Sequence, residues 1–169
     1  MVGTAHLKEP VACTEGERRE FARFVRRGFE GSDESLDDRI RDAKQLAFYY
    51  VARDTLAGIA GLKAPCGQFR EDVFDRACVP ISPDDYPLEL GWVFVDPVHR
   101  GNKVGLGLCR QLLASVTPTG VYSTTRTNNA AMIGILHDLG FERVGEPYSH
   151  RSREHVVFLR PLAHLVSGL

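Results

Sequence analysis

One strand–loop–helix segment in the middle of the chain constrains its fold more than any other feature. An apolar run over 87–95 predicts a buried strand, and apolar residues at helical spacing over about 104–116 predict an amphipathic helix. The loop between them holds Arg100, Gly101 and Lys103. The first N–H groups of a helix have no partner within it, and a helix that starts just above a strand end presents them to an anion. The segment therefore predicts a site for a phosphate-bearing cofactor.

The composition excludes several other classes of protein. The 169 residues suit one domain, which we expect to span 1–169 and to form a core without metal or disulfides. A hydrophobic content of 43% and a charged content of 25% are typical of a soluble globular chain. A net charge of −1 gives no general attraction to nucleic acid or to an acidic membrane. The first ten residues lack the pattern of a signal peptide, so we expect a cytoplasmic protein with no nucleic acid and no membrane partner.

The cysteines form no C-x-x-C pair. Cys109 lies among apolar residues of the predicted helix and is expected in the core. Cys66 and Cys78 flank a loop, where a disulfide or a shared metal ion stays open as an alternative. Because no histidine lies between them, we favour free thiols in a reducing compartment and expect no metal site.

Two helices are predicted in the N-terminal quarter of the chain. A capping box from Thr14 to Glu17 begins the first, which has an apolar side and an arginine-rich side. A solvated helix face explains these arginines better than binding to a polyanion. The second helix is expected to begin near Ser32 or Ser35, and an extra strand around 6–13 stays open.

The rest of the pattern alternates strands and helices. Two β-rich runs, 46–53 and 58–64, predict an antiparallel hairpin. Residues 65–85 have no clean period and predict a long acidic loop with one short helical turn at most. A strand over 121–125 follows, then a helix that Asn128 or Asn129 caps and Gly140 ends, then a second hairpin over 141–145 and 155–160. This order predicts a mixed central sheet with helices on both faces.

Two motifs lie within this pattern. The run from Val95 to Gly105, V-D-P-V-H-R-G-N-K-V-G, ends a predicted strand and begins a predicted helix. The run from Asn129 to Phe141 is an Asn-led helix that ends in G-F. Together they resemble the acyl-CoA signature, V-x-P-x-x-R-G-x-G-x-G or -A, and the second motif of the GNAT N-acetyltransferase superfamily. The resemblance covers about residues 46–160, with the elements in the family's order.

The resemblance implies both a fold and an activity. The GNAT fold is α/β, with a mixed, mostly antiparallel central sheet of six or seven strands, a V-shaped splay between the central strands, and helices on both faces. The implied activity is transfer of an acetyl group from acetyl-CoA, the acyl-donor substrate, to a primary amine of a small molecule, a peptide or a protein. The alternative is a regulatory protein that binds an acyl-CoA without catalysis. A homodimer also stays open.

The resemblance also implies which residues contact the cofactor. In this family coenzyme A lies on the loop and the helix start, and its pantetheine arm enters the splay beside the preceding strand. The N–H near the end of that strand would also polarise the thioester carbonyl. Carried over to this sequence, the contacts fall on Val93, Phe94, Val95, Arg100, Gly101, Asn102, Lys103, Val104, Gly105, Leu106, Gly107, Asn129 and Met132.

Two residues depart from the family pattern and keep the non-catalytic alternative open. Lys103 stands at the third glycine of the signature, where we favour a functional loop with an added cation. Leu136 stands four residues before Gly140, where many members have a tyrosine that protonates the leaving thiolate. His137 is the alternative catalytic acid, although it lies about 100° round the helix from that position and also suits the helix dipole.

A base is also needed if the acceptor amine arrives as an ammonium. Glu89 begins the central strand on the acceptor side of the family geometry, and burial there would raise its pKa towards that of a useful base. A strand-end carboxylate that orders a loop is an equally good explanation. The residues expected to contact the acceptor are Tyr86, Asp85, Tyr122 and Arg126.

Overall fold

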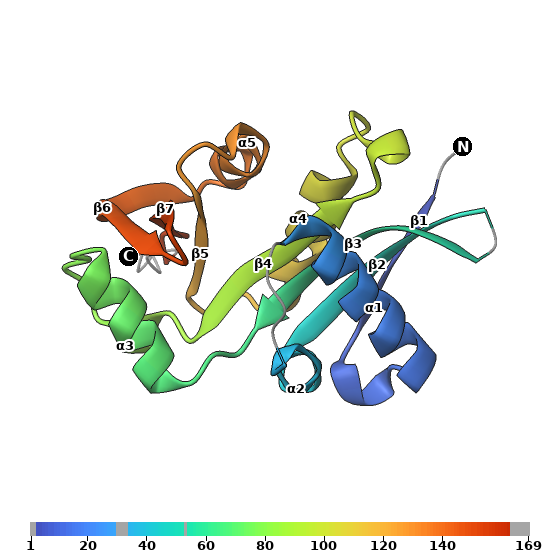
Figure 1. Ribbon diagram of the computed structural model, residues 1–169, viewed down its shortest axis with the longest axis horizontal. Coiled ribbons are helices and arrows are strands. Elements are labelled where there is room, and N and C mark those ends of the chain that lie inside the picture. The colour runs from blue at the N-terminus through green and yellow to red at the C-terminus, as the bar shows by residue number, and fades with distance from the viewer. Residues whose placement is uncertain (1–2, 30–33, 53, 163–169) are drawn as a thin grey trace, which may run out of the picture.

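A single mixed sheet organises the chain in the computed structural model, which describes residues 3–29, 34–52 and 54–162. The sheet has seven strands in the order β1-β2-β3-β4-β5-β7-β6 (Figure 1). Its strands are β1 (Thr4–Lys8), β2 (Gln45–Val51), β3 (Thr55–Lys63), β4 (Leu88–Val95), β5 (Val121–Arg126), β6 (Glu142–His150) and β7 (Arg153–Leu159). All neighbouring strands are antiparallel except β4 and β5, which are parallel. The predicted α/β fold class with a mostly antiparallel sheet is confirmed.

Helices cover both faces of this sheet. The α-helices are α1 (Glu15–Gly28), α2 (Leu36–Arg41), α3 (Gly67–Arg76), α4 (Val104–Ser115) and α5 (Ala130–Asp138). Short 3-10 helices are η1 (Pro10–Ala12), η2 (Pro83–Asp85) and η3 (Pro97–His99). One core lies between the sheet and helices α4 and α5. The other face carries two separate cores, one beneath α1 and α2 and one beneath α3.

Most elements lie where the sequence predicts them, and two differ. The predicted long loop over 65–85 is wrong in its first half, because α3 occupies ten residues of it. Val73 and Phe74 are the buried residues of this helix. Two adjacent apolar residues do not make a helical repeat that can be detected in the sequence. The first strand ends at Lys8 because Pro10 begins η1. Ser35 precedes α2 as its N-cap, whereas Ser32 lies outside the described residues.

The docking of α3 onto β6 depends on main-chain atoms. The Glu146 N–H donates to the Ala77 carbonyl over 2.6 Å, just beyond the end of α3. Gly145 has a φ of +65°, and a Cβ there would lie only 2.1 Å from the same carbonyl oxygen. A glycine is therefore needed at this contact for both its conformation and its size.

Strands β4 and β5 diverge, as the family resemblance predicts. Their register contains only Leu88 opposite Val121 and Glu89 opposite Tyr122. One further link follows, from the Ser123 hydroxyl to the Leu90 carbonyl over 2.8 Å. On its other side, β4 stays paired with β3 through to Val95. The second half of β4 thus lies apart from β5, which opens the V seen in Figure 1.

A bulge in β4 accompanies this divergence. The β3–β4 register passes from Gly61 opposite Gly91 to Ile59 opposite Phe94, so two residues of β4 lie opposite one of β3. Trp92 occupies the bulge with a left-handed φ of +52°. An extra residue increases the local twist and turns the following residues relative to the sheet.

The N-terminus of α1 is fixed by Glu17. Glu17 completes the predicted capping box with Thr14, and its Oε1 also contacts the Lys8 ammonium of β1 at 2.5 Å. The hydrogen bond from Lys8 is the main reason that the pKa of Glu17 lies below its usual value. A lowered pKa in the folded state means that this interaction stabilises the protein above the ordinary glutamate pKa and is lost as the pH falls.

We therefore expect Glu17→Gln to lower the free energy of unfolding by about 1 kcal/mol at neutral pH, since glutamine still caps the helix but loses the ion pair. The difference from wild type should shrink as the pH falls below about 4. Urea unfolding across this pH range measures it. Glu20→Gln is the control, because the pair of Glu20 with Arg23 is more exposed and its loss should change little. A difference that stays constant with pH would contradict the role of the ion pair.

Candidate functional site

The start of α4 presents unpaired main-chain N–H groups. Lys103 is its N-cap and makes no side-chain capping bond. The Gly107 N–H donates to the Lys103 carbonyl at 2.9 Å, so the N–H groups of Val104, Gly105 and Leu106 precede the first hydrogen bond of the helix. Gly101, before them, has a φ of +83°. Such a turn into a helix start is suited to binding an anion.

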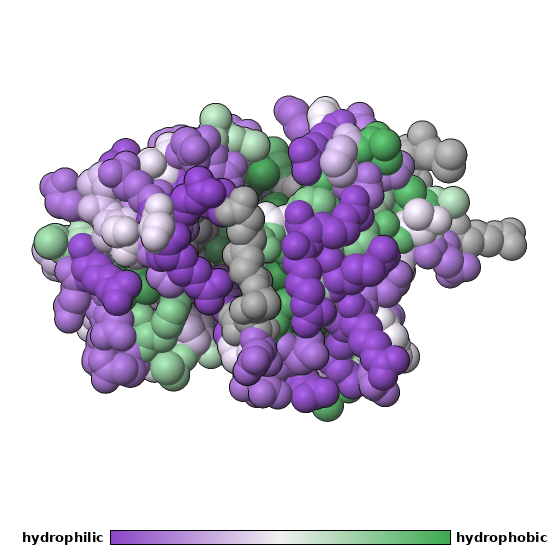
Figure 2. All heavy atoms as spheres, in the orientation of Figure 1, coloured by the Kyte–Doolittle hydropathy of each residue, from purple (hydrophilic) through white to green (hydrophobic). Residues whose placement is uncertain are grey.

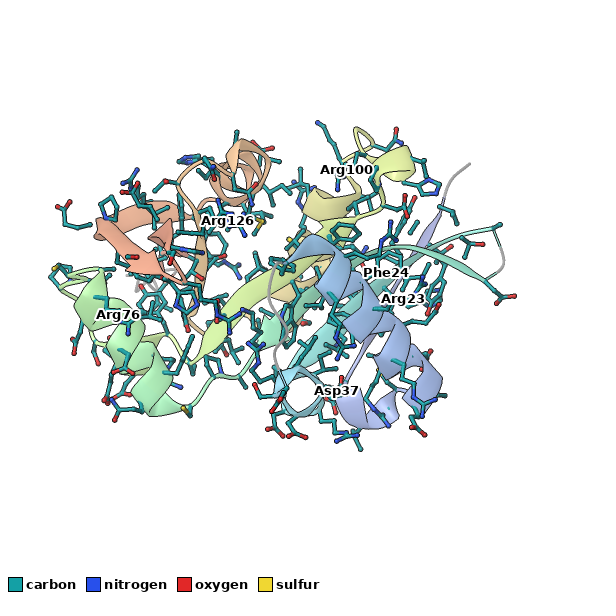
Figure 3. All side chains as sticks on the ribbon, viewed as in Figure 1. Arg23, Phe24, Asp37, Arg76, Arg100 and Arg126 are labelled. Atoms are coloured by element: carbon teal, nitrogen blue, oxygen red, sulfur yellow. The ribbon has the colours of Figure 1, made fainter. Side chains whose placement is uncertain are left out.

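The charges of this loop favour an anion as well. Arg100 and Lys103 are exposed, and Figure 3 shows Arg100 in the segment between β4 and α4. Arg100 is held in place because its Nε donates to the Val95 carbonyl at 3.0 Å. Asp96 is neutralised by the Arg27 guanidinium of α1 at 3.0 Å, which lowers the pKa of that carboxyl. The loop therefore presents cations outwards.

The glycines of the signature have different roles here. A Cβ at Gly105 would lie 3.3 Å from Ile135 of α5 and 3.4 Å from Val93 of β4, so Gly105 lets α4 pack close to both. A Cβ at Gly101 or at Gly107 would meet nothing within 4 Å. The sequence motif alone does not show that Gly105 is needed for packing whereas Gly101 and Gly107 lie beside open space.

The predicted contacts in β4 lie on the diverging half of the strand. Val93, Phe94 and Val95 are half-buried, although β5 is not paired with them. The Phe94 ring packs against α1, with its centroid 5.8 Å from that of Phe24, so only its main chain faces the splay. In the second motif, Asn129 caps α5 by accepting from the Met132 N–H at 3.1 Å.

Glu89 is the centre of a buried polar cluster on the face of α1 and α3. Its side chain is 5% exposed. Lys63 of β3 donates to Oε1 at 3.0 Å, Thr124 of β5 donates to the same oxygen at 3.1 Å, and Tyr122 donates to Oε2 at 3.4 Å. Lys63, Glu89 and Tyr122 lie in register across three strands. The burial of Glu89 matches the sequence analysis. Its partner Lys63 was not predicted. The available signal was that Lys63 is the only charged residue in the predicted strand 58–64.

Two phenols, Tyr122 and Tyr148, lie close enough to feel the charge of this carboxylate, and Tyr148 packs beside His155. Burial, followed by the charge of Glu89, raises the pKa of Tyr122, and the same two causes raise that of Tyr148 to about 12. Both phenols therefore act as hydrogen-bond donors near neutral pH. Burial and the neighbouring His155 ring, 5.5 Å away, lower the pKa of His150. Figure 2 shows the surface hollowed between the part over α3 and the part over α1.

The remaining predicted residues are more scattered. Tyr86 is buried beneath α3 against Phe74, whereas Asp85 is exposed on η2. Arg126 is half-buried at the end of β5, and Figure 3 shows it near α5. His137 is exposed, with its ring edge-on to Phe158 at 5.7 Å. Within the described ranges, no hydrogen bond or ring contact joins His137 to Glu89.

Leu136 is fully buried in the core beneath α4 and α5. It therefore packs as a core residue at the position where many family members have the catalytic tyrosine. A tyrosine substituted there would have to displace core side chains before its hydroxyl reached the splay.

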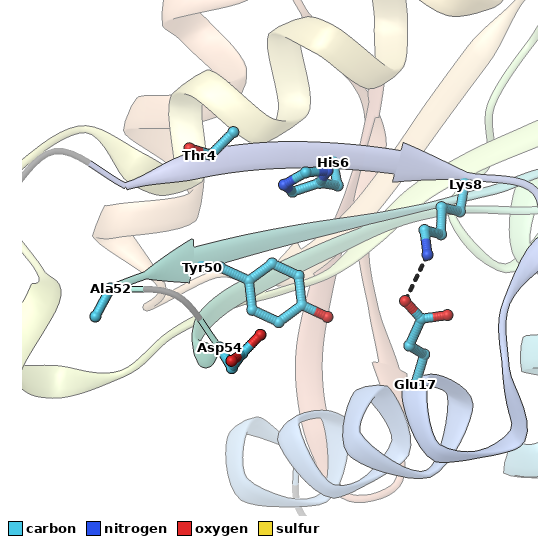
Figure 4. Close-up of a pocket in the computed structure, with 7 residues that line it drawn as sticks. All are labelled: Thr4, His6, Lys8, Glu17, Tyr50, Ala52 and Asp54. Carbon is cyan, nitrogen blue, oxygen red and sulfur yellow. Dashed lines mark hydrogen bonds and ion pairs between the residues drawn. The ribbon is translucent and has the colours of Figure 1, made fainter.

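A cavity of about 470 Å³ lies at the opposite edge of the sheet (Figure 4). It is lined by Thr4, His6, Lys8, Glu17, Tyr50, Ala52 and Asp54. Its principal charged pair is Lys8 with Glu17, which already stabilises α1. None of the residues predicted to contact cofactor or acceptor lines it, so it is separate from the candidate site.

The cysteines do not form a disulfide. All four are free: Cys13 and Cys109 are buried, and Cys66 and Cys78 are exposed. Burial raises the pKa of the Cys109 thiol to about 12, which makes it an inert core residue. The described part of the chain holds no group of three or more metal-ligating side chains, and none of its helices combines the length and apolar character needed to cross a bilayer.

Sequence comparison gives local matches only. No protein-family model matches the chain. The N-alpha-acetyltransferase RimI of Mycobacterium tuberculosis and an uncharacterized protein of Mycobacterium leprae are each 35% identical to it over 60 residues, or 36% of this chain. The matched segment covers 38% of the first and 17% of the second, so the chain matches well under half of either relative.

Structural comparison covers nearly the whole chain. Escherichia coli ElaA matches with a TM-score of 0.70 at 17% identity, over 94% of this chain and 99% of that one. A GNAT-family acetyltransferase from Streptococcus agalactiae matches with a TM-score of 0.64 at 14% identity, over 92% and 94%. YncA, a putative acetyltransferase from Salmonella typhimurium solved with its cofactor acetyl-CoA, matches with a TM-score of 0.62 at 16% identity, over 94% and 92%. The chain thus has the fold of the GNAT acetyltransferases, and these identities establish the fold alone.

The loop geometry predicts the effect of restoring the family glycine. Lys103 has a left-handed φ of +56°, a conformation that costs a side chain with a Cβ about 1 kcal/mol. Lys103→Gly should therefore raise the free energy of unfolding by about 1 kcal/mol, as urea unfolding would measure. Lys103→Ala is the matched control, because it removes the charge and keeps the Cβ. An equal gain in both variants would show that charge, not backbone strain, is relieved.

Proposed function

We propose that this chain is an acetyl-CoA-dependent N-acetyltransferase that acts on a primary amine. The observation that carries the proposal is the position of the α4 start, which presents unpaired N–H groups and two cations beside the diverging half of β4. A protein of the same fold, YncA, was solved with acetyl-CoA. The motif of the sequence analysis and the geometry of the loop support the same substrate.

In this proposal the loop binds the diphosphate of acetyl-CoA. The N–H groups of Val104, Gly105 and Leu106 donate to it, and Lys103 and Arg100 supply positive charge. The pantetheine arm then follows the half of β4 that β5 leaves unpaired. The main-chain N–H near Val95 would polarise the thioester carbonyl as charge develops on its oxygen.

The acceptor amine approaches from the side of Glu89. As the base, Glu89 takes a proton from the acceptor, whose nitrogen then attacks the thioester carbon. The carbon–sulfur bond breaks, coenzyme A leaves as a thiolate, and the attacking nitrogen gives up its second proton to water. Because Leu136 replaces the usual tyrosine and is buried, water supplies the proton to sulfur in this proposal. The acceptor is a primary amine of a small molecule, a peptide or a protein, and the RimI relative adds peptide α-amines to the amines worth testing.

The second candidate function is a regulatory protein that binds an acyl-CoA without transferring its acyl group. The observation that favours it is that Glu89 already has hydrogen-bond partners within the protein. Its Oε1 accepts from both Lys63 and Thr124. A panel of small amines, peptides and lysine-rich proteins, assayed by the release of the coenzyme A thiol, separates the two functions. Acetyl-CoA binding without thiol release on any acceptor would favour regulation.

Binding of acetyl-CoA should depend on the charge of the loop. Isothermal calorimetry should show that wild type binds and that Lys103→Glu binds at least about tenfold more weakly, since an attraction becomes a repulsion. Lys44→Glu is the matched control, because Lys44 is an exposed lysine outside this loop. If both variants bound acetyl-CoA equally weakly, the net charge of the protein and not this loop would determine the affinity. Equal affinity in all three proteins would refute the assignment of the loop as the binding site.

Turnover should depend on the carboxylate of Glu89. With the best acceptor of the panel, Glu89→Gln should lower kcat by about a hundredfold and leave acetyl-CoA affinity nearly unchanged. This substitution also leaves the Lys63 ammonium without its partner, so Glu89→Gln combined with Lys63→Met removes both charges as a control. If the double variant regained the wild-type rate, Glu89 would not be the base.

A further inference from the structure

The acceptor side of the site already contains an amine of the chain itself. The Lys63 Nζ lies 3.0 Å from Glu89 Oε1, and the Lys63 side chain is 19% exposed. An amine at hydrogen-bond distance from a buried carboxylate is the arrangement that transfer requires of an acceptor and its base.

Several residues keep the Lys63 amine in this position. Lys63 and Glu89 lie opposite each other in the β3–β4 register. The lysine stem crosses Gly91, where a Cβ would lie 2.5 Å from its Cε and 2.9 Å from its Nζ. The ammonium also lies 5.4 Å from the centre of the Trp92 ring, and Gly61 leaves room for that ring because a Cβ there would lie 2.7 Å from it. Two glycines and the bulge residue therefore shape the place that the lysine occupies.

This place adjoins the part of β4 along which the pantetheine arm and its thioester are proposed to enter. Gly91 and Trp92 directly precede Val93 to Val95, the segment proposed to contact the pantetheine arm as it carries the thioester. The thioester enters along the splay, so it would reach Lys63 from within the protein and does not require the lysine to be exposed. The other lysines are less suited: Lys44 and Lys103 are exposed, and Lys8 pairs with Glu17 at the far edge of the sheet.

We propose that Lys63 is an internal acetyl acceptor, so that the protein acetylates itself at this residue. This inference rests on the proposed function. Glu89 takes a proton from the Lys63 ammonium, and the neutral nitrogen attacks the acetyl carbon. The new nitrogen–carbon bond forms as the carbon–sulfur bond breaks, and the thiolate takes up the second proton that the nitrogen loses. Each event converts one lysine and one acetyl-CoA into N-acetyllysine, coenzyme A and one proton released from Glu89 to solvent.

Self-acetylation would change the site in two ways. It removes the positive charge that pairs with Glu89, and it leaves an amide where an external amine would bind. The modified protein should therefore transfer acetyl groups to external amines more slowly than the unmodified protein.

The test is mass spectrometry of the purified full chain incubated with acetyl-CoA and no added acceptor. Intact mass should show one added acetyl group, and peptide mapping should place it on Lys63. The first-order rate should not depend on protein concentration, because the step occurs within one molecule. Lys44 is the internal control for chemical acetylation, and it should react at least about a hundredfold more slowly than Lys63.

Three variants test the arrangement itself. Lys63→Arg keeps the ion pair and should gain no acetyl group at this position. Glu89→Gln should slow modification of Lys63 by about a hundredfold. Should Glu89→Gln fail to fold, Gly91→Ala answers the same question, because its Cβ displaces the lysine stem without touching Glu89 and should also slow the modification.

The outcomes separate this inference from the proposed function. If calorimetry shows acetyl-CoA binding and the amine panel shows turnover while Lys63 stays unmodified, Lys63 is only a charge partner of Glu89 and the inference is overturned. Modification of Lys63 at the rate of Lys44, unchanged in Glu89→Gln and Gly91→Ala, means chemical acetylation and overturns it equally. Absence of acetyl-CoA binding overturns the proposed function itself.

Discussion

The candidate site depends on how β4 separates from β5. These two strands are the parallel neighbours in the sheet, and their register stops after two residue pairs. Strand β3 holds the other side of β4 as far as Val95, so β4 continues as a fixed edge, and none of the described strands pairs with its far side. The bulge at Trp92 adds twist at that point. The position of α4 above this edge, and that of Glu89 at the point of divergence, both follow from the same separation.

The separation also explains why the two faces of the sheet differ. On one face a single core runs beneath α4 and α5 and contains residues from both halves of the sheet, such as Leu90 and Phe158. On the other face the cores beneath α1 and α3 are separate. The continuous core keeps the two halves together, and on the divided face the Glu89 cluster lies where the two smaller cores meet the diverging strands. In the proposed function, the donor thioester and the acceptor amine would approach the same stretch of β4 from opposite faces.

Elements with a strong local signal were predictable from the sequence. The capping box of α1, both hairpins and the strand–loop–helix segment were found because caps, alternation and helical periods are local properties. Helix α3 was missed because it buries only two side chains of its own. The motif predicted the turn into α4 that is proposed to bind the cofactor, but it did not predict the left-handed backbone of Lys103, since lysine rarely adopts it. The ion pair of Lys63 and Glu89 was missed because it depends on the register between two strands. The hydrophobic pattern of a sequence does not determine that register at a polar strand end.

The contact between α3 and β6 has an evolutionary consequence. Helix α3 forms one wall beside the Glu89 cluster, and it is joined to β6 by a hydrogen bond between main-chain groups at Ala77 and Glu146. Gly145 is the residue that this bond constrains, while the side chains of Glu146 and Pro147 are exposed. This surface beside the Glu89 cluster can therefore change its side chains without losing its attachment to the sheet. If the proposed function holds, a lineage of such proteins could diversify its choice of amine by drift at these positions, with the fold and the proposed acetyl-donor loop left intact.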